Sequence, residues 1–190
     1  DAGATAEIFV KFIEMLREQG ITDLMKLNQF GSNNADAVRK LPTYHVIILA
    51  KNEVGRVNLY TLVSKSHLEY YARRPRIPKS ELSRYREGLI VGRACEAGDL
   101  YQALLNEKSE ERIAKIVNFY DYLEIQPLGN NRFMIDSEKI TKVQNEEDLK
   151  ELNRKIVELR ERFNKPVVGT CDVHFMDPGD EVYRRIIMAG

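Results

Sequence analysis

The stretch Pro166-Val-Val-Gly-Thr-Cys-Asp-Val-His-Phe-Met-Asp-Pro-Gly-Asp180 decides the fold class of this chain. Residues 167–170 are small or β-branched, which is typical of a strand buried on both faces. Asp172 and His174 follow at its carboxyl end. Because side chains alternate along an extended chain, both point to the same side. A carboxylate and an imidazole on one face can bind a divalent metal such as Zn, Mn or Fe.

The residues after this pair favour a new helix. Asp177 can cap it, Pro178 fits its first position, and Asp180 lies in its first turn. A strand, a metal-type pair and a helix in this order indicate an α/β barrel with a site at its carboxyl-terminal rim. The alternative is a turn in which Asp172 and His174 satisfy only local backbone groups, because two ligands do not make a metal site.

Composition indicates an ordinary globular chain. Its 190 residues are 43% hydrophobic and 31% charged, with a formal net charge of zero, so no global basic field attracts nucleic acid or an anionic membrane. No apolar run of about 18 residues predicts a membrane span, and no basic-then-apolar leader suggests export. Cys95 and Cys171 are expected to be reduced thiols, which favours the cytoplasm.

Four apolar runs alternate with helical patterns. We expect strands near 46–49, 89–92, 122–125 and 167–170 and a long helix capped by Asn145. Near-continuous apolar strands joined by helices predict a parallel sheet covered by helices. Since about eight such units close an ordinary barrel, we expect part of a (β/α) barrel or a small open sheet.

The first residues differ from the rest. Apolar side chains from Ile8 to Leu16 follow helical spacing, and Gly20 ends the run. Because the chain enters this helix at once and without Met, we interpret it as a fragment of a longer polypeptide. We expect residues 1–20 to be a helix, 21–43 to be a connector, and 44–190 to form the α/β part.

Several segments together resemble the PHP (polymerase and histidinol phosphatase) domain of bacterial DNA polymerase III alpha subunits, specifically the PolC type. The segments that carry the resemblance occur in the order of that family and cover nearly everything from Tyr44 onward. They are Tyr44–Asn52, Ser64–Tyr71, Pro75–Pro78, Glu87–Gly92 with Cys95, Tyr122–Pro127 and Pro166–Ile187.

The amino-terminal helix adds to this resemblance. The PolC type carries a DnaQ-like 3′–5′ exonuclease inserted within its PHP domain, and the start Asp1-Ala2 is similar to the end of the last exonuclease motif. The resemblance implies that residues 1–20 are the last helix of that exonuclease, that Asp1 is an exonuclease metal ligand, and that 44–190 is the carboxyl-terminal portion of a PHP-type (β/α) barrel.

The resemblance also implies metal ligands, which on these residues are His45, Cys95, Asp172 and His174. His45 precedes its strand, so spacing alone does not place it at the carboxyl-terminal rim; a half-buried, hydrogen-bonded imidazole is the alternative. Cys95 is either a zinc-binding thiolate or a small buried hydrophobe.

Three other features have plainer interpretations. Cys171 faces away from Asp172, which favours packing. His67 lies at a helical position among aromatic residues, which favours a structural role. The basic cluster Arg73, Arg74, Arg76 and Lys79 is either a phosphate contact or a solvated loop.

The implied function is a piece of a replicative DNA polymerase whose parent chain also has 3′–5′ exonuclease activity. The parent would use DNA, deoxynucleotides and other replisome subunits as partners, and no membrane. It would use Zn or Mn at the PHP site and Mg at the exonuclease and polymerase sites. This piece would have no catalytic residue of its own, would bind metal weakly or not at all, and would be inactive alone. A free-standing PHP phosphoesterase similar to histidinol phosphatase and a non-catalytic interaction module are the alternatives.

Overall fold

The computed structural model describes residues 2–32, 38, 40–171 and 173–189. The chain forms two compact units. The first unit comprises residues 1–43 and 52–88, and the second comprises 44–51 and 89–190. Residues 52–88 are thus an insertion into the sequence of the second unit. Asp1 and Asp172, both predicted metal ligands, lie outside the described residues.

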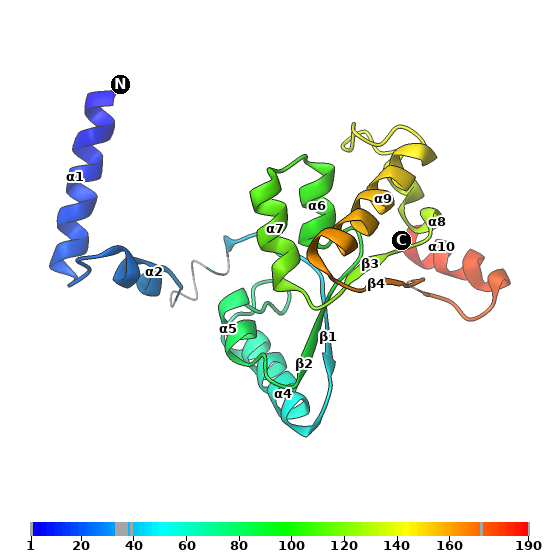
Figure 1. Cartoon of the computed structure of the whole chain (residues 1–190), viewed down its shortest axis with the longest axis horizontal. Coiled ribbons are helices and arrows are strands. Elements are labelled where there is room, and N and C mark those ends of the chain that lie inside the picture. Colours follow the sequence, from blue (N-terminus) through cyan, green and yellow to red (C-terminus); the bar gives the residue numbers. More distant parts are fainter. Residues whose placement is uncertain (1, 33–37, 39, 172, 190) are drawn as a thin grey trace. The chain divides into compact units, whose positions relative to one another are not determined.

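Helices make up the first unit (Figure 1). They are α1 (Ala2–Glu18), α2 (Leu24–Ser32), α4 (Glu53–Leu68) and α5 (Lys79–Arg84). The helix predicted near the start of the chain is therefore present as α1. It buries none of its residues, and the side chains of Phe9 and Phe12 are 63% and 56% exposed. Its apolar stripe is thus uncovered.

Helix α4 begins at a close backbone contact. The Asn52 side chain caps the helix by accepting a hydrogen bond of 2.9 Å from the Gly55 N–H. A Cβ atom on Gly55 would lie 1.8 Å from the Gly88 carbonyl oxygen, and Gly88 has a φ of +71°. The Asn58 side chain adds a hydrogen bond of 2.9 Å to the Glu87 carbonyl. The two ends of the insertion are therefore held together.

The described residues of the second unit form four strands, close to their predicted positions. They are β1 (Val46–Ala50), β2 (Leu89–Arg93), β3 (Leu123–Ile125) and β4 (Val167–Gly169). Strands β3 and β4 pair in parallel, and a parallel bridge between Gly92 and Tyr122 joins β2 to β3. Strand β1, however, pairs antiparallel with β2.

The prediction of four parallel strands is therefore wrong for β1. Its apolar run, Val-Ile-Ile-Leu, reads equally well in either direction, and the insertion returns the chain to β2 in the opposite sense. The described strands form two pairs joined by the bridge, and they do not close a barrel. A mixed sheet with helices replaces the expected parallel barrel segment.

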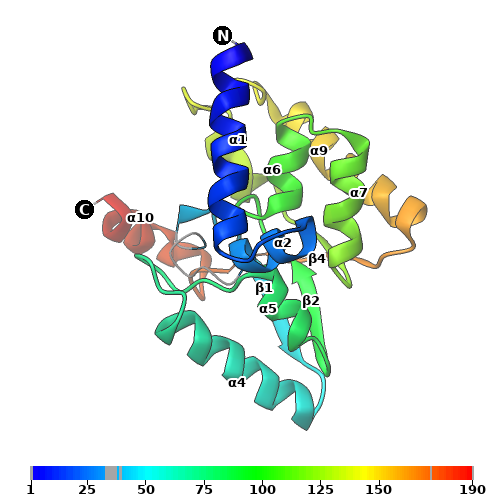
Figure 2. The ribbon, with the colours of Figure 1, turned by 90° about the vertical axis from the view of Figure 1, so that its left-hand side faces the viewer.

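Three helices of the second unit lie side by side in both views (Figures 1 and 2). They are α6 (Asp99–Leu105), α7 (Glu110–Phe119) and α9 (Glu146–Phe163), and α9 also packs against β3 and β4. The short helices α8 (Leu128–Asn131) and η1 (Arg132–Met134) follow β3. Fully buried side chains from the strands and helices form the core: Val91, Leu100, Val117, Leu123 and Ile156.

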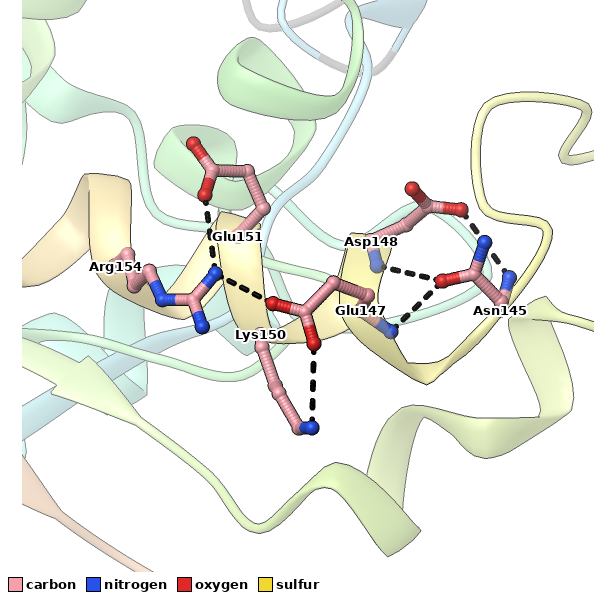
Figure 3. Close-up of polar contacts among 6 residues, drawn as sticks. All are labelled: Asn145, Glu147, Asp148, Lys150, Glu151 and Arg154. Carbon is pink, nitrogen blue, oxygen red and sulfur yellow. Dashed lines mark hydrogen bonds and ion pairs between the residues drawn. The ribbon is translucent and has the colours of Figure 1, made fainter.

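Helix α9 matches its sequence prediction closely. Figure 3 shows Asn145 accepting hydrogen bonds from the Glu147 and Asp148 N–H groups at 2.8 and 3.2 Å, while Asp148 accepts from the Asn145 N–H at 3.1 Å. This is a capping box, which satisfies free N–H groups at the helix start. The buried face carries four residues at helical spacing: Leu149, Leu152, Ile156 and Leu159.

The last described elements are a short turn η2 (Pro178–Asp180) and helix α10 (Glu181–Ala189), so the predicted helix start at Asp177 is confirmed. Helix α10 buries none of its residues, and Ile186 and Ile187 are 66% and 78% exposed. Among the helices of the described segments, none is both long enough and apolar enough to cross a membrane.

Candidate metal site

The direction of the four strands gathers most of the predicted ligands at one edge of the second unit. Strands β2, β3 and β4 run in the same direction, so their carboxyl ends share an edge. Because β1 runs antiparallel, its amino end reaches the same edge, and Val46 pairs with Arg93. His45 therefore precedes β1 at the edge where Cys95 follows β2.

His45 and Cys95 meet at this edge. The Cys95 Sγ lies 3.4 Å from the His45 Nδ1, although the two residues are 50 positions apart. A backbone hydrogen bond of 3.2 Å from the His45 N–H to the Ala97 carbonyl holds the segment before β1 against the segment after β2. His45 is exposed, so the alternative of a hydrogen-bonded, half-buried imidazole is wrong about burial, whereas the contact with Cys95 agrees with its hydrogen bond. Cys95 is half-buried.

The separation of these two atoms fits zinc. Zinc binds imidazole nitrogen at about 2.0–2.1 Å and thiolate sulfur at about 2.3 Å in a tetrahedral arrangement. Two such ligands on one ion would then lie about 3.6 Å apart, close to the separation in the structure. The Nδ1 and Sγ atoms therefore have the chemistry and the spacing of neighbouring metal ligands.

The other predicted ligands follow β4. His174 is exposed in the segment between β4 and η2. Asp172, like Asp1, lies outside the described residues. Within the part of the chain that the structure describes, no third His, Cys, Asp or Glu joins His45 and Cys95 in a group able to hold a metal. The structure thus brings two predicted ligands together and places a third after the neighbouring end of β4.

Cys171 corrects another prediction. The sequence predicts that Cys171 packs against other residues, but it is exposed. Its backbone carbonyl instead accepts a hydrogen bond of 2.8 Å from the Asn130 side chain of α8. The contact lies directly before the segment that carries Asp172 and His174.

Sequence reasoning missed a buried polar cluster beneath this edge. Arg93 and Glu124 are each 1% exposed, and an Arg93 N–H donates to the Glu124 backbone carbonyl. The Arg93 guanidinium also lies 5.2 Å from the centre of the Tyr101 ring. The signal was a glutamate between two apolar residues in the short strand β3, which places a carboxylate in the core.

Burial dominates the electrostatics of this cluster. Desolvation lowers the pKa of Arg93, and the nearby Glu124 charge opposes that shift. Burial likewise raises the pKa of Tyr101 to about 12. Tyr101 therefore keeps its proton at neutral pH. A guanidinium stays charged in proteins, so Arg93 supplies a positive charge beneath the edge.

The remaining candidates lie in the first unit. The His67 Nδ1 is 2.9 Å from the Val63 carbonyl of its own helix, and its ring stacks with Tyr71, contacts that agree with the structural role expected for it. Arg76 donates to the Leu41 and Ala72 carbonyls. Arg73 and Arg74 are exposed beside it in the predicted loop.

Comparison with known proteins identifies relatives along the whole chain. The model of the PHP domain family matches residues 5–128. A DNA polymerase III PolC-type of Clostridium perfringens is 56% identical over 191 aligned residues, covering 100% of this chain and 13% of that protein. Those of Caldanaerobacter subterraneus and Bacillus subtilis are 53% and 40% identical, covering 90% and 100% of this chain and 12% and 13% of their own lengths.

Proposed function

The chain belongs to the PHP domain family, and we propose that it works as the metal-binding PHP portion of a PolC-type replicative DNA polymerase. The observation that carries this proposal is the coverage of its relatives. PolC-type polymerases match 90–100% of this chain, yet the chain spans only about 13% of their length. The pair His45 and Cys95 adds two ligand-type side chains that meet at one edge of the sheet.

In this proposal the parent protein carries the catalytic work. It would synthesise DNA on a template from deoxynucleotides, remove errors with a 3′–5′ exonuclease, and act in the cytoplasm with other replisome subunits. Residues 1–20 would be the last helix of the exonuclease, with Asp1 as one of its Mg ligands, and 21–43 a connector. The uncovered apolar stripe of α1 supports this division, because a helix from another domain would lack its own core here.

Residues 44–190 would hold part of the PHP metal site through His45, Cys95, Asp172 and His174. Zinc suits the imidazole and thiolate pair, whereas manganese suits the carboxylate and imidazole pair. A bound ion of either kind supplies a Lewis acid for phosphoryl oxygens. The residues of this chain would orient that ion against the sheet edge, with Arg93 keeping a positive charge beneath them.

The metal proposal is tested by comparing the full-length polypeptide with the chain of residues 1–190. After dialysis, the full-length protein should retain zinc or manganese, and His45→Ala should reduce the amount. The 190-residue chain should retain little metal. It offers few ligands, and their binding free energy is too small to offset ion dehydration and the ordering of the site. Elemental analysis measures both.

Activity assays on the same samples separate the alternatives. Primed-template synthesis should occur with the full-length polypeptide, and the 190-residue chain should neither synthesise DNA nor hydrolyse nucleotides or phosphoesters. Stoichiometric metal in the 190-residue chain, with phosphoester turnover abolished by Asp172→Asn, would instead establish a free-standing PHP phosphoesterase.

A further inference from the structure

Asn130 connects the end of β3 to the segment after β4. Its side-chain N–H donates to the Cys171 backbone carbonyl at 2.8 Å and lies 3.5 Å from the Gln126 side-chain oxygen. Both neighbours are oxygens, so the amide must present its nitrogen here. Thr170, one residue earlier, is fixed by its own backbone hydrogen bond of 3.1 Å to the Ile125 carbonyl. The hydrogen bond from Asn130 therefore extends the order of β4 by one residue, to Cys171.

The buried Glu124 determines how the side-chain amide of Gln126 is oriented toward Asn130. Glu124 is 1% exposed, and its carboxylate accepts a hydrogen bond of 2.9 Å from the Gln126 side-chain nitrogen. This contact turns the Gln126 side-chain oxygen toward Asn130. The Gln126 backbone carbonyl is itself held at 3.1 Å by the Asn153 side chain of α9. A chain of hydrogen bonds thus links the buried Glu124 to the Cys171 carbonyl, with Asn130 donating to both of its neighbours.

We propose that Asn130 is a positioning residue for the metal site, and this rests on the proposed function. By holding the Cys171 carbonyl, it fixes the start of the segment that carries Asp172 and His174. It contacts no metal itself. Fixing the backbone at Cys171 before an ion binds lowers the ordering cost of binding, and such preorganisation raises affinity.

The test uses Asn130→Ala and Asn130→Asp in the full-length polypeptide, with zinc alone as the probe. Alanine removes the side-chain N–H donor. Aspartate keeps the shape of asparagine but places a carboxylate oxygen, an acceptor, against the Cys171 carbonyl and the Gln126 side-chain oxygen. Outer-shell partners typically contribute about 10–100-fold to metal affinity. Because Asn130 acts through the backbone, we expect a loss of about tenfold in a competition titration against a chromophoric chelator.

Asn106→Ala is the matched control. Its side chain also donates to a backbone carbonyl, that of Gln102 at 2.7 Å, but at the far end of α6 from Cys95. This variant should bind zinc as the wild type does. Hydrogen exchange adds a positional readout: the segment from 171 to 177 should exchange faster in the Asn130 variants, while β2 should not.

The outcomes separate the two proposals. Wild-type zinc affinity in both Asn130 variants, with affinity lost in His45→Ala, would overturn the role of Asn130 and leave the metal site intact. If His45→Ala also bound zinc with wild-type affinity, the proposed metal site itself would be contradicted. If the aspartate variant does not fold, the alanine variant, which adds no charge, decides the matter.

Discussion

At the scale of single residues, Gly55 and Gly88 approach each other more closely than any side chain would permit. The Gly88 backbone occupies the space of a Gly55 side chain, and because the obstacle is backbone, rotation of a side chain cannot relieve it. Gly88 also has the left-handed conformation that glycine adopts at low cost. The contact therefore depends on both residues lacking a Cβ.

We expect Gly55→Ala to lower the free energy of unfolding by about 2–3 kcal/mol, near the upper end for overpacking. The better helix propensity of alanine, about 1 kcal/mol, acts in the opposite direction and is too small to compensate. Urea denaturation measures the difference. Gly129→Ala in α8 is the control, because nothing lies within 4 Å of its added Cβ. Equal stability of the two variants would contradict the prediction.

Residue patterns predicted which side chains could be ligands, but they did not predict that His45 and Cys95 contact each other. The types and positions of His45 and Cys95 were visible in the sequence, but their contact depends on the direction of β1, which an apolar run does not encode. Arg93 was missed because it directly continues an apolar run, where a charged residue is usually exposed.

At the scale of elements, α9 shows how much a local pattern can determine. Its cap, its length and its four buried residues were all predictable, since capping and 3.6-residue periodicity are local properties. Strand β1 shows the opposite case. Its position was correct, but its antiparallel pairing arises from a distant partner, β2, beyond the insertion.

We expect Asn145→Ala to destabilise the protein by about 1 kcal/mol, because two N–H groups at the start of α9 lose their acceptor. The loss should appear in global unfolding, since the buried face of α9 belongs to the core. Asn145→Asp keeps the cap and should remain close to the wild type. A loss of similar size in the aspartate variant would mean that the cap is not the cause.

Glu147 gives α9 a dependence on pH. Its carboxylate contacts Arg154 at 2.6 Å and Lys150 at 3.2 Å (Figure 3), and hydrogen bonds to these cations hold its pKa below the ordinary 4.5. A lowered pKa stabilises the fold above the ordinary value, and this contribution is lost as the pH falls through the folded-state pKa.

Glu147→Gln should therefore be less stable than the wild type at pH 7, and the gap should close below about pH 4.5. All three side chains are largely exposed, so salt should shrink the gap at pH 7. Thermal unfolding from pH 7 to 3 measures it. A gap that persists at pH 3 would show that charge is not responsible.

At the scale of the whole molecule, the uncovered stripe of α1 should influence association. Exposed apolar side chains at positions 8, 9, 12 and 15 make a continuous face. Removal of residues 1–20 should reduce self-association in sedimentation and leave the unfolding of the second unit unchanged. Replacing Phe9 and Phe12 with serine should have the same effect. Loss of cooperative unfolding on deletion would show that α1 belongs to the core.

The contact between the two ends of the 52–88 insertion determines where residues can be added to this chain or removed from it. Asn52 and Asn58 at one end meet Glu87 and Gly88 at the other, so the insertion is a closed loop.

Doubling the length of a flexible loop adds only about 0.6 kcal/mol of closure entropy. Extra residues in the segment from 73 to 78 should thus be well tolerated. A single added residue between Ala50 and Asn52 would strain both the contact between the two ends of the insertion and the pairing of β1 with β2. Insertions and deletions among relatives should therefore collect within the loop and avoid its two ends.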